Sequence, residues 1–111
     1  GQTILLAAQQ QTSGTPTEPD YLRARVGTLR ETRAGIDHLL DQNGLDLYVV
    51  AGVTSLPPIS GYPGLTVPIG LADNGMPFSI TFGGRAYSEA LLIRAAYAFE
   101  QAFGQRALPK L

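Results

Sequence analysis

The chain has 111 residues, of which 44% are hydrophobic, and a net charge of −1. This composition excludes wholesale disorder, and the length allows one domain at most. The near-neutral charge provides no basic surface for nucleic acid, and no apolar run approaches the ~20 residues that span a bilayer. Cysteine is absent and His38 is the single histidine, which leaves no cluster of metal ligands. We expect no nucleic-acid, membrane or metal partner.

The chain begins at Gly1, and its single methionine is Met76. We therefore expect a processed product or an expressed piece, whose lack of a signal peptide says little about its location. Our working expectation is a cytoplasmic protein. Residues 1–17 are predicted to form a short helix or frayed end followed by a linker, and residues 18–111 to form a single α/β piece.

A long amphipathic helix is predicted over residues 18–42. Thr17 and Asp20 match a capping box at its start, and Asn43-Gly44 provides the left-handed stop that a helix end prefers. The apolar residues that recur at helical spacing are Leu22, Val26, Leu29, Ile36 and Leu40. Two glycines inside the helix weaken it, so packing must stabilise it.

A β-hairpin is predicted after a short buried strand at 45–51 and a loop at 52–64. Asn74-Gly75 between two alternating runs is a strong signal for a two-residue hairpin turn. Counting outward from this turn gives the pairs Leu71–Phe78, Ile69–Ile80 and Val67–Phe82. All three pairs fall on one face, which would be the buried face.

A last helix is predicted from Ser88, its N-cap, to about Phe103, with a stop at Gly104. Glu89 is favourably placed against the helix dipole, and Tyr87 could contact Leu92 in a hydrophobic staple. One wide apolar stripe contains Leu91, Leu92, Ala95, Ala96, Ala98, Phe99, Ala102 and Phe103, and a second patch on the opposite side contains Ala90, Ile93 and Tyr97. A helix that is apolar on two sides requires two packing partners.

Several short motifs in a particular order carry a resemblance to a known family. They are Gly-Ile-Asp-His-Leu-Leu at 35–40, Leu-Asp at 45–46, Gly-Tyr-Pro-Gly-Leu-Thr-Val-Pro at 61–68, Asn-Gly-Met-Pro at 74–77, and Gly-Arg-Ala-Tyr-Ser-Glu-Ala at 84–90 with Leu92 and Arg94. From about Tyr21 onward, the chain resembles the C-terminal end of an amidase signature family enzyme.

This resemblance implies an α/β/α sandwich around a mixed sheet, to which the chain contributes the long helix, the strand, the hairpin and a last helix packed on the sheet. It also implies hydrolysis of carboxamide C–N bonds by a serine–cis-serine–lysine triad, with no cofactor: the lysine accepts a proton through one serine, and the other serine attacks the carbonyl. The chain has no Gly-Ser-Ser stretch, and its one lysine is Lys110, directly after Pro109. We expect no catalytic residue in this chain and no activity of the chain alone. Its expected partner is an N-terminal amidase core that carries the triad and binds a small amide.

Candidate substrate-binding residues lie in the segment before the hairpin. By resemblance, Ser55, Ser60 and Tyr62 approach the active-site cleft as part of its wall; the alternative is that they are turn and packing residues. By the same resemblance, the loop at 51–60, which contains Ser55 and Ser60, is shorter than the family pattern, and this loop is where members of the family differ.

The remaining polar residues have simpler interpretations. Arg85 is expected to form an ion pair or to cap a carbonyl, His38 to lie on a helix surface, and Ser88 with Glu89 to cap the last helix. Arg33 is expected to extend along the apolar stripe or to pair with Asp37, four residues on.

Two other functions stay open at this level. The chain could be a non-enzymatic α+β binding or assembly module that docks through the second apolar patch of its last helix, with a homodimer through exposed apolar faces as one form. Within the enzyme hypothesis, the amidase subunit of a glutamyl-tRNA amidotransferase is the rival of a stand-alone amidase.

Overall fold

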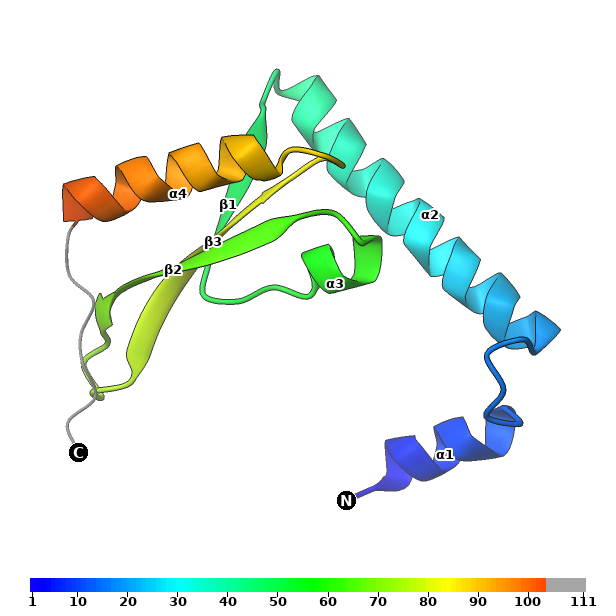
Figure 1. Ribbon diagram of the computed structural model, residues 1–111. Helices are drawn as coiled ribbons and strands as arrows, with labels where there is room; N and C mark the ends of the chain where they lie inside the picture. The colour runs from blue at the N-terminus through cyan, green and yellow to red at the C-terminus, as the bar shows by residue number, and fades with distance from the viewer. Residues whose placement is uncertain (104–111) are drawn as a thin grey trace.

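The computed structural model describes residues 1–103 and contains helices on both sides of a small sheet (Figure 1). The elements are α1 (Thr3–Gln11), α2 (Pro19–Gln42), β1 (Leu47–Ala51), α3 (Leu56–Ser60), β2 (Gly64–Leu71), β3 (Pro77–Gly84) and α4 (Glu89–Phe103). The mixed α/β architecture and the packing of the last helix on the sheet are as predicted. The expected stop at Gly104 lies outside the described residues.

The sheet has the strand order β1-β3-β2, and both pairings are antiparallel. The last strand is therefore the central one, and it alone joins the other two. Successive side chains of a strand point to opposite faces, and the neighbours Leu47 and Tyr48 belong to different apolar clusters. One cluster lies beneath α4 and the other faces the C-terminal half of α2.

The larger cluster is built between α4 and the sheet. Its buried members are Val67, Phe82, Leu92 and Ala96, surrounded by the partly buried Leu47, Leu65, Ile80, Ala95 and Phe99. The rings of Phe82 and Phe99 meet edge to face, with centroids 5.9 Å apart. The wide stripe predicted on the last helix thus supplies the buried contacts, from its central positions.

The second cluster holds α2 against the opposite face of the sheet. Ile36 and Leu40 are the buried residues of this helix, and they pack with Tyr48. The ring of Tyr48 lies over Gly83, its partner in the β1–β3 ladder: a Cβ added at Gly83 would fall 2.2 Å from Cζ of the ring. The ring can occupy this position because residue 83 has no side chain.

The predicted register of the hairpin is wrong. The observed pairs are Leu65↔Phe82, Val67↔Ile80, Pro68↔Ser79, Gly70↔Phe78 and Leu71↔Pro77, with a bulge between Pro68 and Gly70. A two-residue turn of the expected type needs a positive φ at both central residues; Gly75 has one (+77°), and Asn74 is not among the described residues that do. Instead, Gly75 N–H donates to Ala72 O and Ala72 N–H donates to Met76 O, both at 2.8 Å. These bonds close a three-residue loop. Together with the bulge, this loop shifts the pairing by two residues, so that Val67 lies opposite Ile80 and not opposite Phe82.

Two smaller expectations about the helix ends are also wrong. The N-cap of α2 is Glu18, because Pro19 opens the helix, and no side chain caps it. The Glu18 carboxylate instead accepts hydrogen bonds from N–H and Oγ of Ser13, at 2.8 and 3.0 Å. Tyr87 forms no hydrophobic staple, since its side chain is 94% exposed.

The segment predicted as loop at 52–64 contains the short helix α3.

The chain is more extended than a compact domain of its size. Its radius of gyration is 17.9 Å, whereas a compact domain of this length has about 13 Å. It exposes 8535 Å² of surface, against about 5,900 Å² for a compact monomer of the same mass. Helix α1 has no buried residue, and Ile4 is 84% exposed. None of the helices in the described part is long and apolar enough to cross a membrane.

Candidate functional site

The three candidate residues surround α3, the short helix that leads into β2. Ser55 is the N-cap residue of α3 and is exposed, with no hydrogen bond from its side chain to the helix. Ser60 ends the helix and is completely buried, and Tyr62 follows it at the entry to β2. Gly61 between them has φ +68°, which allows the chain to turn sharply from the helix toward the strand.

The Ser60 side chain serves the local backbone. Its hydroxyl donates to Leu56 O at 2.7 Å, with a longer contact to Pro57 O at 3.3 Å, and its oxygen accepts the N–H of Tyr62 at 3.1 Å. A hydroxyl bound in this way has no base to take its proton. Its observed contribution is to fix the turn between α3 and β2.

Tyr62 connects this turn to α2. Its hydroxyl donates to Asp37 Oδ2 at 2.9 Å, and the Arg33 guanidinium carbon lies 5.4 Å from the centre of its ring. Arg33 Nε also donates to Ser60 O at 2.7 Å. Burial raises the pKa of the Tyr62 hydroxyl, and the hydrogen bond to the Asp37 carboxylate raises it further. The phenol therefore stays protonated as a hydrogen-bond donor.

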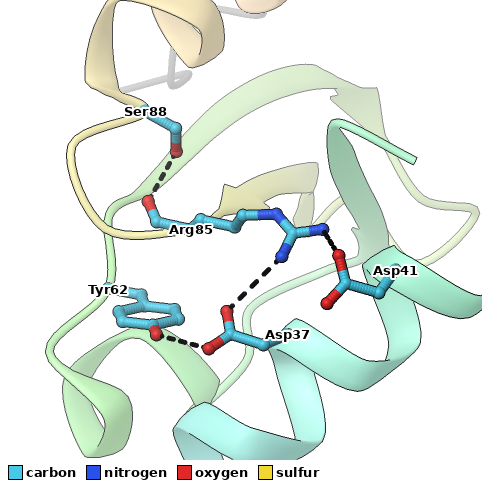
Figure 2. A network of polar contacts seen from close by, with 5 residues as sticks. All are labelled: Asp37, Asp41, Tyr62, Arg85 and Ser88. Carbon is cyan, nitrogen blue, oxygen red and sulfur yellow. Dashed lines mark hydrogen bonds and ion pairs between the residues drawn. The ribbon is translucent and has the colours of Figure 1, made fainter. Parts of the chain in front are cut away.

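Arg85 brings a third segment to the same place, the turn between β3 and α4 (Figure 2). Its guanidinium donates to Asp41 Oδ1 at 2.7 Å and lies 3.9 Å from Asp37 Oδ1. The hydrogen bond to Asp41 raises the pKa of Arg85 above its usual value. Ser88 Oγ donates to the Arg85 carbonyl oxygen at 2.7 Å, so the backbone of this turn is fixed as well.

We call this set of side chains the three-segment network: Arg33, Asp37, Asp41, Tyr62 and Arg85. The two oxygens of Asp37 face different segments, since one accepts from Tyr62 and the other faces Arg85. Its two arginines balance its two aspartates, so the formal charge of the network is zero. Its geometry suits fixing three segments relative to one another rather than proton transfer.

The prediction of an ion pair for Arg85 is confirmed, and the suggested pairing of Arg33 with Asp37 is wrong. Arg33 reaches forward to Ser60 and Tyr62, and Asp37 turns to Tyr62 and Arg85. The spacing of Arg33, Asp37 and Asp41 by four residues did signal a common helix face. Their partners on two distant segments left no signal that a single sequence could show.

An open groove of about 520 Å³ runs beside the network between α2 and α3. It is lined by Tyr21, Arg25, Thr28, Leu29, Arg33, Pro58, Ile59 and Gly61. Two arginines and no acidic residue line the groove, so its lining is positively charged. Ser55 and Ser60 do not line it.

No family model matches the chain, but relatives and solved structures do. A probable amidase of Arabidopsis thaliana is 40% identical over 112 residues, which cover 99% of this chain and 21% of that protein. A glutamyl-tRNA(Gln) amidotransferase subunit of Roseobacter denitrificans is 37% identical over 76 residues, covering 68% of this chain and 15% of that protein.

The fold similarity covers nearly the whole chain. The native peptide amidase of Stenotrophomonas maltophilia superposes with a TM-score of 0.82 and 34% identity, over 99% of this chain and 25% of that one. An amidase family protein of Bacillus anthracis gives a TM-score of 0.81 and 28% identity, over 97% and 21%. The chain thus spans between about a seventh and a quarter of the length of these proteins and corresponds to a C-terminal portion.

Proposed function

Because this chain belongs to the amidase signature family, we propose that it acts as part of a longer enzyme that hydrolyses carboxamide C–N bonds. The observation that supports this most directly is the agreement over almost the whole chain, in sequence with a probable amidase and in fold with a peptide amidase. The chemistry would come from a serine–cis-serine–lysine triad in the remainder of that enzyme. No cofactor enters this proposal.

The part of the chain described by the structure contributes a frame. The hydroxyls of Ser60, which is buried, and Ser88, which is partly buried, donate to backbone carbonyls, so neither has a base as its acceptor. Lys110 lies outside the described residues. We therefore place the nucleophile and the base of the reaction on the N-terminal core, and we place the fixing of one wall of the cleft on this chain.

For that wall we propose the turn around α3, with Ser55, Ser60 and Tyr62. Ser55 is exposed and has no bond to the helix, so it is available to a substrate. Ser60 and Tyr62 would act indirectly, by fixing the turn through Arg33 and Asp37. Differences in this segment would then select among amides through its shape.

The proposed partner is the amidase core itself. Within the described residues β1 and β2 are both edge strands, and exposed edges normally pair or are covered. The surface of the chain also exceeds that of a compact monomer, as shown above. Both observations suit a segment that completes a larger sheet, and both leave a homodimer as the alternative to be tested.

Ammonia release tests the proposed function. The longer polypeptide should release ammonia from simple aryl or aliphatic carboxamides, and the 111-residue chain alone should release none above a blank. Ser60→Ala in the longer enzyme should weaken the reaction without abolishing it, because Ser60 fixes the turn of the proposed wall and is not the nucleophile. Turnover by the isolated chain that Ser60→Ala abolishes would overturn the assignment.

A second candidate is the amidase subunit of a glutamyl-tRNA amidotransferase, supported by the similarity to one such protein over about two thirds of the chain. The more extensive match to a probable amidase favours the stand-alone enzyme. The two candidates differ in what they need for activity: a stand-alone amidase hydrolyses a simple amide without tRNA or further subunits. A non-enzymatic docking module would release no ammonia, whether or not tRNA and further subunits are added.

A further inference from the structure

Tyr87 combines two unfavourable features in the turn before α4. It is the one non-glycine residue with a positive φ in the described part of the chain, at +63°. This left-handed region is disfavoured for a residue with a Cβ, and more so for a bulky one. Its side chain is also 94% exposed, the largest exposure of any large apolar side chain described. Within residues 1–103, a side chain this exposed has little packing that could offset the strain.

The turn is nevertheless firmly constructed. The N–H and Oγ of Ser88 both donate to Arg85 O, at 3.3 and 2.7 Å, and the Arg85 guanidinium is held by Asp41 (Figure 2). Gly84 makes room for it, because a Cβ there would lie 2.3 Å from Ser88 Oγ. These contacts fix the backbone on both sides of residue 87 and present its ring outward.

The helix that follows presents more apolar surface next to this ring. We define the outer face of α4 as Ala90, Ile93 and Tyr97, which share one side at helical spacing. All three are exposed, Ile93 by 58% and Tyr97 by 62%. The inner side of the same helix is used by the sheet, through Leu92 and Ala96. Tyr87 precedes this outer face by one helical turn in sequence.

We propose that Tyr87 and the outer face of α4 dock on the N-terminal body of the longer amidase, with Tyr87 as an aromatic anchor in an apolar pocket. This rests on the proposed function, which makes the chain one part of that enzyme. The relatives carry the equivalent segment in chains about four to seven times longer, so the body of the same polypeptide is the nearest surface. The whole chain exposes about 2,600 Å² more than a compact monomer of its mass, which exceeds the ~800 Å² that one partner buries in a standard interface. Strain at an exposed aromatic residue is then offset by a contact made outside this chain.

Variants at Tyr87 separate the strain from the contact. Asn and Gly both tolerate a positive φ, but neither can fill an aromatic pocket. In the full-length amidase, Tyr87→Asn and Tyr87→Gly should lower the equilibrium constant for folding by about tenfold, the loss expected for a buried anchor. Tyr87→Phe, which keeps the ring, should stay within about twofold of the parent. If Asn and Gly instead raise the constant, by about fivefold as relief of strain alone predicts, the proposal is refuted.

Tyrosine nitration by tetranitromethane, read by mass spectrometry, measures the same contact without a mutation. In the native full-length enzyme, Tyr87 and Tyr97 should react at least about tenfold more slowly than in the urea-unfolded enzyme, because a buried ring is inaccessible. Equal rates would overturn the docking proposal. Protection that disappears on dilution to monomers would assign the surface to a second copy, and would also overturn it. Ammonia release is measured separately, so a failed amidase assignment and a failed docking proposal are distinguishable.

Discussion

Replacing Gly83 by alanine should test the packing of the sheet against α2. The added Cβ would lie 2.2 Å from Cζ, 2.3 Å from Oη and 2.6 Å from Cε2 of Tyr48, all well inside van der Waals contact. The ring is buried between Gly83 and α2, with 9% of the residue exposed, so it must shift within its contacts with Ile36 and Leu40. Overpacking of this kind costs about 1–3 kcal/mol. Alanine gains about 0.5–1 kcal/mol over glycine in a strand. With the middle of both ranges, the net loss should be about 1 kcal/mol.

Urea unfolding followed by circular dichroism measures this loss, and a double-mutant cycle identifies its cause. With Tyr48→Ala in the background, Gly83→Ala should become neutral or slightly stabilising, which gives a coupling energy of about 1–2 kcal/mol. Gly27→Ala is the matched control: an added Cβ at this helical position would touch nothing within 4 Å. It should stabilise by about 1 kcal/mol. A Gly83→Ala variant as stable as the parent, or a coupling energy near zero, would refute the reasoning.

Three further outcomes are expected. Tyr48→Phe should leave the unfolding free energy unchanged or raise it by about 1 kcal/mol, because the Tyr48 hydroxyl is buried without a hydrogen-bond partner in the described residues; a loss measured by urea unfolding would contradict this. The raised pKa of Tyr62 means that the folded state keeps its proton where the unfolded state loses it, so stability should be fully present below pH ~10 and fall above it. Unfolding curves at rising pH should therefore decline less steeply for Tyr62→Phe than for the parent. Asp37→Asn should cost about 1 kcal/mol, because Asp37 serves both Tyr62 and Arg85. Asp41→Asn should cost less than about 0.5 kcal/mol, because Asp41 forms only a surface ion pair with Arg85. Equal losses of unfolding free energy for Asp37→Asn and Asp41→Asn would show that the hydrogen bond from Tyr62 to Asp37 contributes nothing.

Local patterns were sufficient for every element except the short helix α3, and they were insufficient for the register of the hairpin. The helical period between Leu22 and Leu40 predicted α2 to within one residue at its start, because periodicity and a glycine stop act within the helix itself. The Asn74-Gly75 pair correctly predicted a hairpin, but the loop also took in Asp73 and a bulge followed Pro68. Both choices depend on how Val67 and Phe82 reach the cluster under α4, which is tertiary information.

The candidate site shows the same limit at longer range. The sequence predicted that Arg85 would form an ion pair, and the types of residue at 33, 37 and 41 suggested a shared helix face. The sequence could not show that Tyr62, twenty-five positions after Asp37, donates a hydrogen bond to one oxygen of that carboxylate while Arg85 faces the other oxygen. The assignment of Ser55, Ser60 and Tyr62 to the cleft wall stays a prediction.

The position of β3 at the centre of the sheet has a consequence for synthesis on the ribosome. β1 and β2 are translated first, yet neither hydrogen-bonds to the other; each ladder needs residues 77–84. Until that stretch leaves the exit tunnel, the earlier strands are nascent chain with open edges, prone to mispairing. A stop codon ahead of Pro77 would therefore remove both ladders of the sheet together with α4, although β1 and β2 themselves would still be translated.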